Sequence, residues 1–206
     1  MVKSLLSEKD AQEVERAIAR IEQRSATELV VVVLAKSAHY SRFRLLGALA
    51  WALATALVLA HFTPLHVDVC ILAQLPAAIL AYALLGIPAL HRKLISPDEA
   101  ERSVQTRAFA LFAERGLHRT RDRTGLLILI SELEHRVVIL GDSGIHARVH
   151  EDGWKKHVQH IIGAIRRGEA GRGLLEVLAE LEPILGEVAP VRADDTNELP
   201  DALVRG

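Results

Sequence analysis

The sequence predicts an α/β protein with a central β-sheet flanked by helices on both faces, interrupted by a two-helix transmembrane hairpin. Three observations lead to this fold class. Residues 28–36, ELVVVVLAK, are typical of a strand that is buried on both faces. Two long segments without Asp, Glu, Lys or Arg follow it. Two further apolar runs, GLLILIS at 125–131 and RVVIL at 136–140, supply the partner strands much later in the chain.

The composition excludes several classes of function. The chain has 206 residues with 25 Lys and Arg against 26 Asp and Glu, so it lacks the basic footprint of a nucleic-acid-binding protein. Hydrophobic residues make up 50% of the chain, and the mean hydropathy of +0.20 is high for a soluble domain. The single cysteine, Cys70, excludes an intramolecular disulfide framework and a cysteine-based zinc site.

The first predicted element is an amphipathic helix that precedes the valine-rich strand. Ser7 and Asp10 form a variant of the capping box that begins such a helix. Apolar residues then recur at helical spacing, at Val14, Ala17, Ile18 and Ile21. The short polar stretch 25–27 separates this helix from the strand.

The two charge-free segments, 45–62 and 69–90, are predicted to cross a membrane as a hairpin that occupies residues 42–91. Each is close to the roughly 20 residues that a helix needs to cross a hydrocarbon core about 30 Å thick. The alternative is a helical hairpin buried in a soluble core. We favour the membrane because the rest of the chain is too small to bury two helices that are apolar all round.

The charges that flank the spans predict their orientation. Arg42 and Arg44 precede the first span, Arg92 and Lys93 follow the second, and the connecting loop has neither Lys nor Arg. The positive-inside rule therefore places both flanks and both termini in the cytoplasm, with the bilayer as a partner. Alanines offer small faces for packing within the hairpin or in a homo-oligomer, namely Ala54, Ala56, Ala77, Ala78, Ala81 and Ala83.

The remaining elements complete one domain that consists of residues 1–41 and 92–190. Ser96 and Pro97 begin a helix with an apolar stripe that ends near Gly116. The runs GLLILIS and RVVIL follow as an antiparallel hairpin, and two amphipathic helices come after them, at about 151–167 and 174–185. Residues 191–206 are predicted to be a polar, irregular tail.

Four segments of the chain, in this order, resemble the TPM family, whose members include thylakoid-lumen, photosystem II repair and receptor-associated proteins. The segments are TELVVVVLAKSA, AFALFAERGLHRTRDRTGLLILIS, EHRVVILGDSGIHARV and IRRGEAGRGLLEVLAEL. The chain is similar to a bacterial membrane branch in which two spans follow the first strand. This resemblance implies an α/β fold in the inner (cytoplasmic) membrane of a bacterium.

Some members of the family are linked to acid phosphatase activity or metal-ion binding, so the resemblance implies that both be considered as hypotheses for this chain. The family's Asp–Asn pair before the strand glycine corresponds to Arg123 and Thr124 here, and Asp122 lies one place away. The glycine-rich turn corresponds to residues 142–145, with His146 where an acidic residue is common. Because these positions are altered, phosphatase activity does not carry over.

The candidate ligand-binding residues are Asp142, Ser143, Gly144, His146 and Asp122. Asp142 follows a predicted strand, and the turn after it presents a carboxylate together with backbone N–H groups. The carboxyl ends of strands are where α/β folds place ligands. The alternative is an ordinary turn, for which Asp, Ser and Gly are the usual residues.

Histidines at helical spacing suggest a metal site as a further hypothesis. His146 and His150 are four residues apart, and His157 and His160 are three apart. A structural metal site needs three or four convergent ligands, so we favour surface histidines in solvent. We therefore predict no cofactor, with a divalent metal ion as the alternative.

The sequence predicts an integral membrane protein whose cytoplasmic TPM-like domain is a non-enzymatic binding or assembly and maintenance module for membrane protein complexes. The reasons are a compact domain attached closely to the bilayer and the lack of a recognisable catalytic motif. The competing hypothesis is a metal-dependent phosphatase acting on phosphomonoesters through Asp142, Asp122 and nearby histidines.

Overall fold

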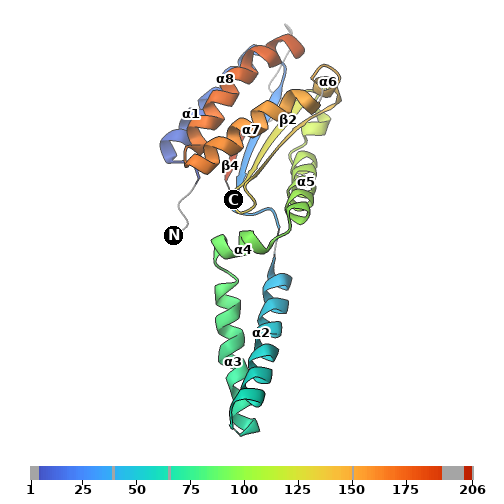
Figure 1. Cartoon of the computed structure of the whole chain (residues 1–206). Coiled ribbons are helices and arrows are strands. Elements are labelled where there is room, and N and C mark those ends of the chain that lie inside the picture. The colour runs from blue at the N-terminus through green and yellow to red at the C-terminus, as the bar shows by residue number, and fades with distance from the viewer. Residues whose placement is uncertain (1–4, 39, 65, 150, 192–201, 206) are drawn as a thin grey trace. The chain divides into compact units, whose positions relative to one another are not determined.

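The computed structural model describes residues 5–38, 40–64, 66–149, 151–191 and 202–205. The chain divides into two compact units. One unit consists of Met1–Ser37 together with Ala100–Gly206, and the other is Ala38–Glu99 (Figure 1). The first unit is therefore assembled from two separate stretches of sequence.

The first unit contains a four-stranded sheet in the order β3-β2-β1-β4. Strand β1 (Glu28–Leu34) pairs in parallel with β2 (Gly125–Ser131) along its whole length, from Glu28 opposite Gly125 to Leu34 opposite Ser131. Strand β3 (Arg136–Gly141) is antiparallel to β2, as predicted, but does not touch β1. The expected α/β fold is confirmed, and its sheet joins a strand from before the inserted helices to strands from after them.

The fourth strand was not predicted. Strand β4 (Ala202–Arg205) lies parallel to β1 at the edge of the sheet, within a segment that the sequence analysis assigned to a polar, irregular tail. Most of that tail, residues 192–201 and 206, lies outside the described residues. The described part shows that the end of the chain contributes to the sheet.

Helices cover both faces of the sheet, as predicted. Helices α1 (Glu8–Arg24), α7 (Glu151–Arg167) and α8 (Ala170–Val188) pack on one face, against alternate β1 residues such as Val31. Helix α5 (Pro97–Glu114) and the short 3₁₀ helix η1 (Leu117–Arg119) pack on the other, against residues such as Val32 (Figure 1). Because successive side chains of a strand point to opposite faces, the continuous valine run fills both cores.

Local sequence signals set the ends of these helices. Ser7 and Asp10 form the predicted capping box, in which each side chain bonds the backbone of the other residue. Between α7 and α8 the chain turns at Gly168, which has a φ of 76°. The two helices then approach closely, since a Cβ at Gly173 would lie 2.2 Å from Cβ of Ala164.

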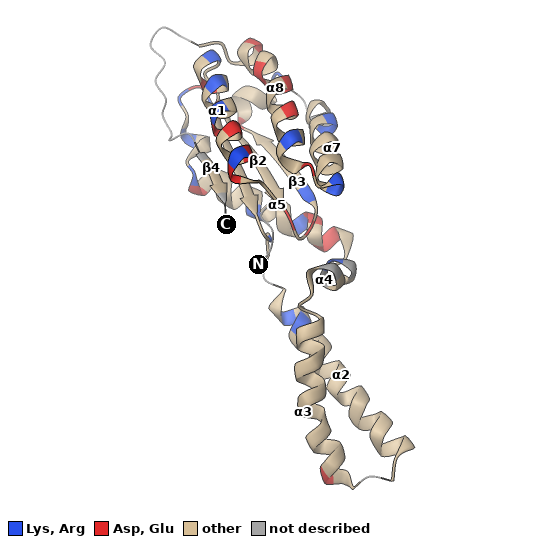
Figure 2. Ribbon diagram, turned by 90° about the vertical axis from the view of Figure 1, so that its left-hand side faces the viewer, with Lys and Arg blue, Asp and Glu red and all other residues tan. Residues whose placement is uncertain are grey.

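The second unit is a pair of apolar helices, α2 (Ser41–Phe62) and α3 (Val67–Leu84), followed by the short helix α4 (Pro88–Leu94). Both long helices are long and apolar enough to cross a membrane, and only 11% of the most apolar window of each is buried. Large side chains along them are exposed, for example Leu57 at 72% and Ile79 at 70%. Acidic and basic residues cover the α/β unit but are nearly absent from these helices (Figure 2).

The second helix is shorter than the predicted span 69–90. It ends at Leu84, and Pro88 begins α4 instead of kinking a continuous helix. Proline has no N–H for a helical hydrogen bond and is favoured in the first turn of a helix. At this end of the hairpin Arg44 joins α2 to α3. Its guanidinium lies 4.0 Å from the ring centroid of Tyr82 and donates to the Tyr82 carbonyl at 3.0 Å.

The central position of β2 gives a direct test of this core. Ile128 is fully buried on the α1, α7 and α8 face of the sheet. We expect Ile128→Ala to lower the free energy of unfolding by about 2–5 kcal/mol, because it leaves a cavity that the strands cannot close. Urea denaturation of the detergent-solubilised chain measures this change. Phe109→Ala on α5 is the control, since that side chain is 63% exposed. An equal loss in both variants would contradict the assigned packing.

Candidate functional site

The predicted site residues lie in a turn that follows β3. Asp142 caps the short helix α6 (Ser143–His146), and its Oδ1 accepts a hydrogen bond from the Ser143 N–H at 2.7 Å. Ile145 is fully buried and anchors the turn in the core. His146 is exposed at the end of α6. The carboxylate of Asp142 thus already accepts a hydrogen bond from the backbone of its own turn.

A second loop, residues 122–124, packs directly against this turn. The N–H of Gly144 donates to the Arg123 carbonyl at 2.9 Å, and the guanidinium of Arg123 lies 3.7 Å from Oδ2 of Asp142. A Cβ at Gly144 would lie 2.4 Å from the carbonyl oxygen of Asp122, so the close approach requires glycine here. The structure therefore brings Asp122, Asp142, Ser143 and Gly144 together.

The position of this site in the sheet differs from the expected one. Asp142 does follow the carboxyl end of β3, but β3 is antiparallel to β2. The turn therefore lies beside the amino ends of the parallel strands β1 and β2, where the Asp142 N–H donates to the Gly125 carbonyl at 2.9 Å. The rule that ligands bind at carboxyl ends applies to parallel strands and does not support this site.

A cavity of about 180 Å³ opens between this pair of loops and the end of α8. Its polar lining includes Asp122, Thr124 and Arg148. Val188 at the end of α8 and the two residues after it, Ala189 and Pro190, also line it. Arg148 donates to the Val188 carbonyl. Sites for whole metabolites usually measure about 300–1,000 Å³, so this cavity fits a side chain or a small ion better than a metabolite.

Sequence reasoning did not identify Thr124 and Arg148 as site residues. Thr124 was noted only as a departure from the family pattern, and its Oγ1 donates to the Ala26 carbonyl beside β1. Arg148 follows α6 within the segment EHRVVILGDSGIHARV, and the sequence analysis assigned it no role in the site. Both residues line the cavity only because segments far apart in sequence meet there. The spacing of residues within one segment does not predict such a meeting.

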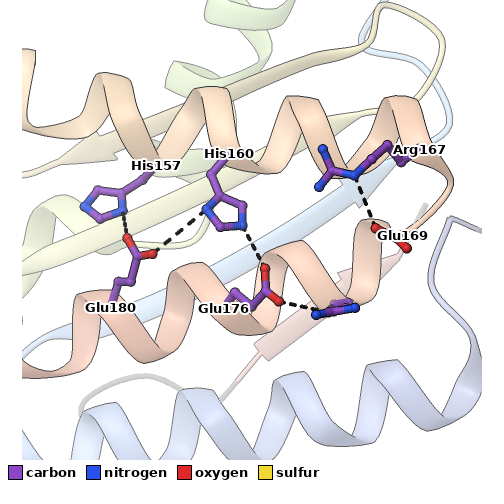
Figure 3. A network of polar contacts seen from close by, with 7 residues as sticks. His157, His160, Arg167, Glu169, Glu176 and Glu180 are labelled. Atoms are coloured by element: carbon purple, nitrogen blue, oxygen red, sulfur yellow. Dashed lines mark hydrogen bonds and ion pairs between the residues drawn. The ribbon is translucent and has the colours of Figure 1, made fainter.

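The structure describes only one of the two histidine pairs completely. His150 lies outside the described residues, so the pair with His146 has no structural description. His157 is only 1% exposed, which corrects its assignment to the solvent-exposed surface. Its Nδ1 lies 3.1 Å from a carboxylate oxygen of Glu180, and Nε2 of His160 lies 2.8 Å from Glu176 (Figure 3). These contacts join α7 to α8.

The contacts between α7 and α8 shift two pKa values. Burial lowers the pKa of His157 below 6.5, the charge of Lys156 adds to this, and the Glu180 carboxylate opposes it. Hydrogen bonds from His160 and Arg172 lower the pKa of Glu176. Among the described residues, no group of three or more His, Cys, Asp or Glu side chains is arranged to hold a metal ion. Of the histidines considered, His157 and His160 contact glutamates of α8 and so join it to α7.

The fold and the site define an α/β domain with a mixed four-stranded sheet, helices on both faces and two apolar helices inserted after the first strand. A family model described as the TPM domain matches residues 92–183. The chain therefore contains a TPM domain, which confirms the resemblance inferred from the sequence. The matched residues include β2 and β3, and β1 completes their sheet from before the insertion.

A solved structure supports the fold independently. The NMR structure of the BA42 protein from the psychrophilic bacterium Bizionia argentinensis matches 100% of this chain, and 99% of its own chain is covered. The TM-score is 0.62 and the sequence identity is 18%, so the likeness concerns the fold alone. No curated protein matches the chain.

The histidine and glutamate contacts predict how stability depends on pH. The unfolded chain binds a proton at His157 more readily than the folded chain, so the free energy of unfolding falls as the pH drops below 6.5. Glu176 adds a further loss below its ordinary pKa of 4.5. Urea denaturation at pH 7.5, 6.5 and 5.5 measures the first effect.

Two variants separate His157 from the other histidines. We expect His157→Gln to flatten the pH dependence between pH 7.5 and 5.5, because the buried titrating group is gone. His146→Gln should keep the dependence of the unmodified chain, since His146 is exposed. If both variants show the same slope as the unmodified chain, His157 is not the titrating group.

Proposed function

We propose that this chain is an integral membrane protein whose TPM domain is a binding or assembly and maintenance module for membrane protein complexes, without enzymatic activity. The observation that supports this most strongly is the exposed apolar surface of α2 and α3. Side chains such as Leu46, at 67% exposure, and Leu57, at 72%, point away from the hairpin. Such a surface requires lipid or another apolar partner around it.

The connections to the hairpin support a domain that works close to the membrane. Only residues 35–40 separate β1 from α2. An extended chain spans at most about 3.5 Å per residue, so this connection does not exceed roughly 21 Å. We propose that so short a tether restricts the domain to partners at or near the same bilayer.

The chemistry of the site favours binding over catalysis. The Asp142 carboxylate bonds its own turn and lies next to Arg123. A guanidinium at this distance stabilises a resting carboxylate, and it competes with a cation for it. The small cavity beside it, with Arg148 and Thr124 in its lining, suits a side chain of a partner protein. We propose no resident cofactor for this function.

One observation favours the second candidate, a metal-dependent phosphatase acting on phosphomonoesters. Oδ2 of Asp142 is buried and accepts no hydrogen bond, and Asp122 lies on the adjoining loop. A divalent ion prefers carboxylate oxygens of this kind. Asp142 and Asp122 would then be its protein ligands, with His146 exposed nearby. The ion pair with Arg123 weighs against this candidate.

The location proposed for the chain is the inner membrane of a bacterium, crossed twice, with both termini in the cytoplasm. Arg42, Arg44 and Arg92 lie at the flanks of α2 and α3, whereas the connection between these two helices carries no Lys or Arg. The alanine-rich faces of the spans make a homo-oligomer an additional proposal.

The proposed orientation has a direct test with reporter fusions. Fusions of a cytoplasm-active reporter after Lys36 and after Gly206 should both be active, because both positions belong to the α/β unit. A fusion after His66, in the connection between α2 and α3, should be active only with a periplasm-active reporter. Activity of both cytoplasmic fusions in the periplasmic assay instead would contradict the orientation.

The proposed binding role has a test at the cavity. After cross-linking in native membranes, the tagged chain should recover a membrane protein in stoichiometric amount. Arg148→Glu should reduce that recovery at least tenfold, because it reverses the charge at the cavity. Arg166→Glu, on the exposed side of α7, is the matched control and should have no effect.

Phosphatase activity of the purified chain would overturn this proposal. Purified chain with 4-nitrophenyl phosphate and Mg²⁺ should show the same background turnover as Asp142→Asn. Turnover that requires the divalent ion and disappears in Asp142→Asn would instead establish the phosphatase.

A further inference from the structure

Arg44 is the charged residue at the boundary of the apolar part of the hairpin. It lies in the first turn of α2, and the charge-free segment 45–62 begins directly after it. The next Lys or Arg in the chain is Arg92, beyond both apolar helices. In the membrane location that we propose, Arg44 therefore stands at the level of the lipid phosphates, which long basic side chains at helix ends commonly reach.

The end of α3 fixes the position of the Arg44 guanidinium. The guanidinium lies 4.0 Å from the ring centroid of Tyr82, in the last turn of α3, and donates to the Tyr82 carbonyl at 3.0 Å. It also lies against Gly86, where a Cβ would be 2.5 Å from Nη2 of Arg44 and 2.8 Å from its Cζ. A guanidinium that is already held in place loses less conformational freedom when it binds an anion.

Most hydrogen-bond donors of this guanidinium lack an acceptor among the described residues. A guanidinium carries five N–H donors, and the acceptor that the described residues supply is the Tyr82 carbonyl. Nε of Arg44 is buried and has no hydrogen-bond partner among them. Buried donors without an acceptor are rare in proteins because they cost free energy. Since Arg44 as a whole is partly exposed, a group from outside the chain can reach its guanidinium and supply the missing acceptor.

The charge of Arg44 is also unbalanced, so the missing acceptor is an anion. The acidic residues of the second unit are Asp68, Asp98 and Glu99, and none of the described residues forms an ion pair with Arg44. Asp68 lies in the first turn of α3, which has 18 residues, so the helix separates it from the last turn by about 20 Å. Figure 2 shows basic residues of the hairpin at the end where α2 begins and an acidic residue at the opposite end.

We propose that Arg44, positioned by Tyr82 and Gly86, is a binding site for the phosphate of an anionic phospholipid at the cytoplasmic surface of the bilayer. This inference rests on the membrane location that we propose for the chain. The guanidinium fork matches two phosphate oxygens. The acyl chains of the same lipid cover the exposed side chains that follow on α2, such as Leu45 at 59% exposure and Leu46 at 67%.

Soluble phosphate and an acidic protein segment are the less favoured occupants. Soluble phosphate offers the same oxygens to Arg44, but it has no apolar part to cover Leu45 and Leu46. An acidic side chain of another protein would have to lie beside an apolar helix at the edge of the hydrocarbon, where carboxylates are costly. A phospholipid satisfies the guanidinium and the apolar side chains together.

Native mass spectrometry of the full chain in mild detergent tests the preference for an anionic lipid. The delipidated chain is offered equal amounts of phosphatidylglycerol, which is anionic, and phosphatidylcholine, which is zwitterionic, with the same acyl chains. We expect roughly tenfold more chain with one bound phosphatidylglycerol than with one bound phosphatidylcholine, the factor typical of a hydrogen bond to a charged group.

Three variants identify the group responsible. Arg44→Gln should abolish the preference. Gly86→Ala should abolish it as well, although every charge remains, because the added methyl group displaces the guanidinium. Arg42→Gln is the matched control, since it removes the same charge from an exposed side chain in the same turn of α2, and it should keep the preference. Far-UV circular dichroism checks that each variant keeps its helical content.

Several results would overturn the lipid site. One is equal binding of the two lipids by the unmodified chain. Another is an equal loss of preference in Arg42→Gln and Arg44→Gln, which would indicate general attraction to basic residues, and a third is full preference in Gly86→Ala. Displacement of phosphatidylglycerol by inorganic phosphate at constant ionic strength would assign the site to soluble phosphate. Displacement by a short glutamate peptide would assign it to an acidic protein segment.

The lipid site and the proposed function can fail separately. If the chain stays in the membrane fraction after alkaline carbonate extraction but shows no preference for phosphatidylglycerol, the membrane location stands and the lipid site is wrong. If the preference is found but no membrane protein is recovered after cross-linking, the lipid site stands and the binding function fails. If alkaline carbonate extracts the chain, the membrane location fails and the lipid site fails with it.

Discussion

The parallel pairing of β1 with β2 is the constraint on which the rest of the structure depends. The two strands match residue for residue over seven positions, although the two apolar helices come between them in the sequence. Both strands are almost completely buried, so neither is stable without the other and without helices on each face. The sheet therefore requires that the chain leaves the domain, forms the hairpin and returns to the same unit.

This constraint also explains where the candidate site residues lie in the domain. Because β3 returns antiparallel, the turn at Asp142 and the loop at Asp122 meet beside the amino ends of β1 and β2. The close contact at Gly144 and the ion pair with Arg123 make this a closely packed corner with a small cavity. In the function we propose, this corner provides specific contacts for a partner side chain and the apolar hairpin provides the attachment to a membrane.

Much of the fold was predictable because its signals are local. The runs of β1, β2 and β3, the capping box at Ser7 and the helix start at Ser96 all depend on neighbouring residues. Strand β4 was missed because four residues at the end of a polar segment carry no periodicity, and only the open edge of β1 makes them a strand. The burial of His157 and the contribution of Arg148 to the cavity depend on how α7, α8 and the loops pack together, so no sequence spacing indicated them.

One measurement tests the central claim that strands from before and after the apolar hairpin form a single sheet, in a chain that we propose is inserted in a membrane. In a Cys70→Ser chain, Leu34→Cys and Ser131→Cys place two thiols at paired positions of β1 and β2. The account predicts that a disulfide between them forms upon mild oxidation of isolated membranes, in protein that stays in the membrane fraction after alkaline carbonate extraction. Failure of this disulfide to form, or its formation only in carbonate-soluble protein, would contradict the account.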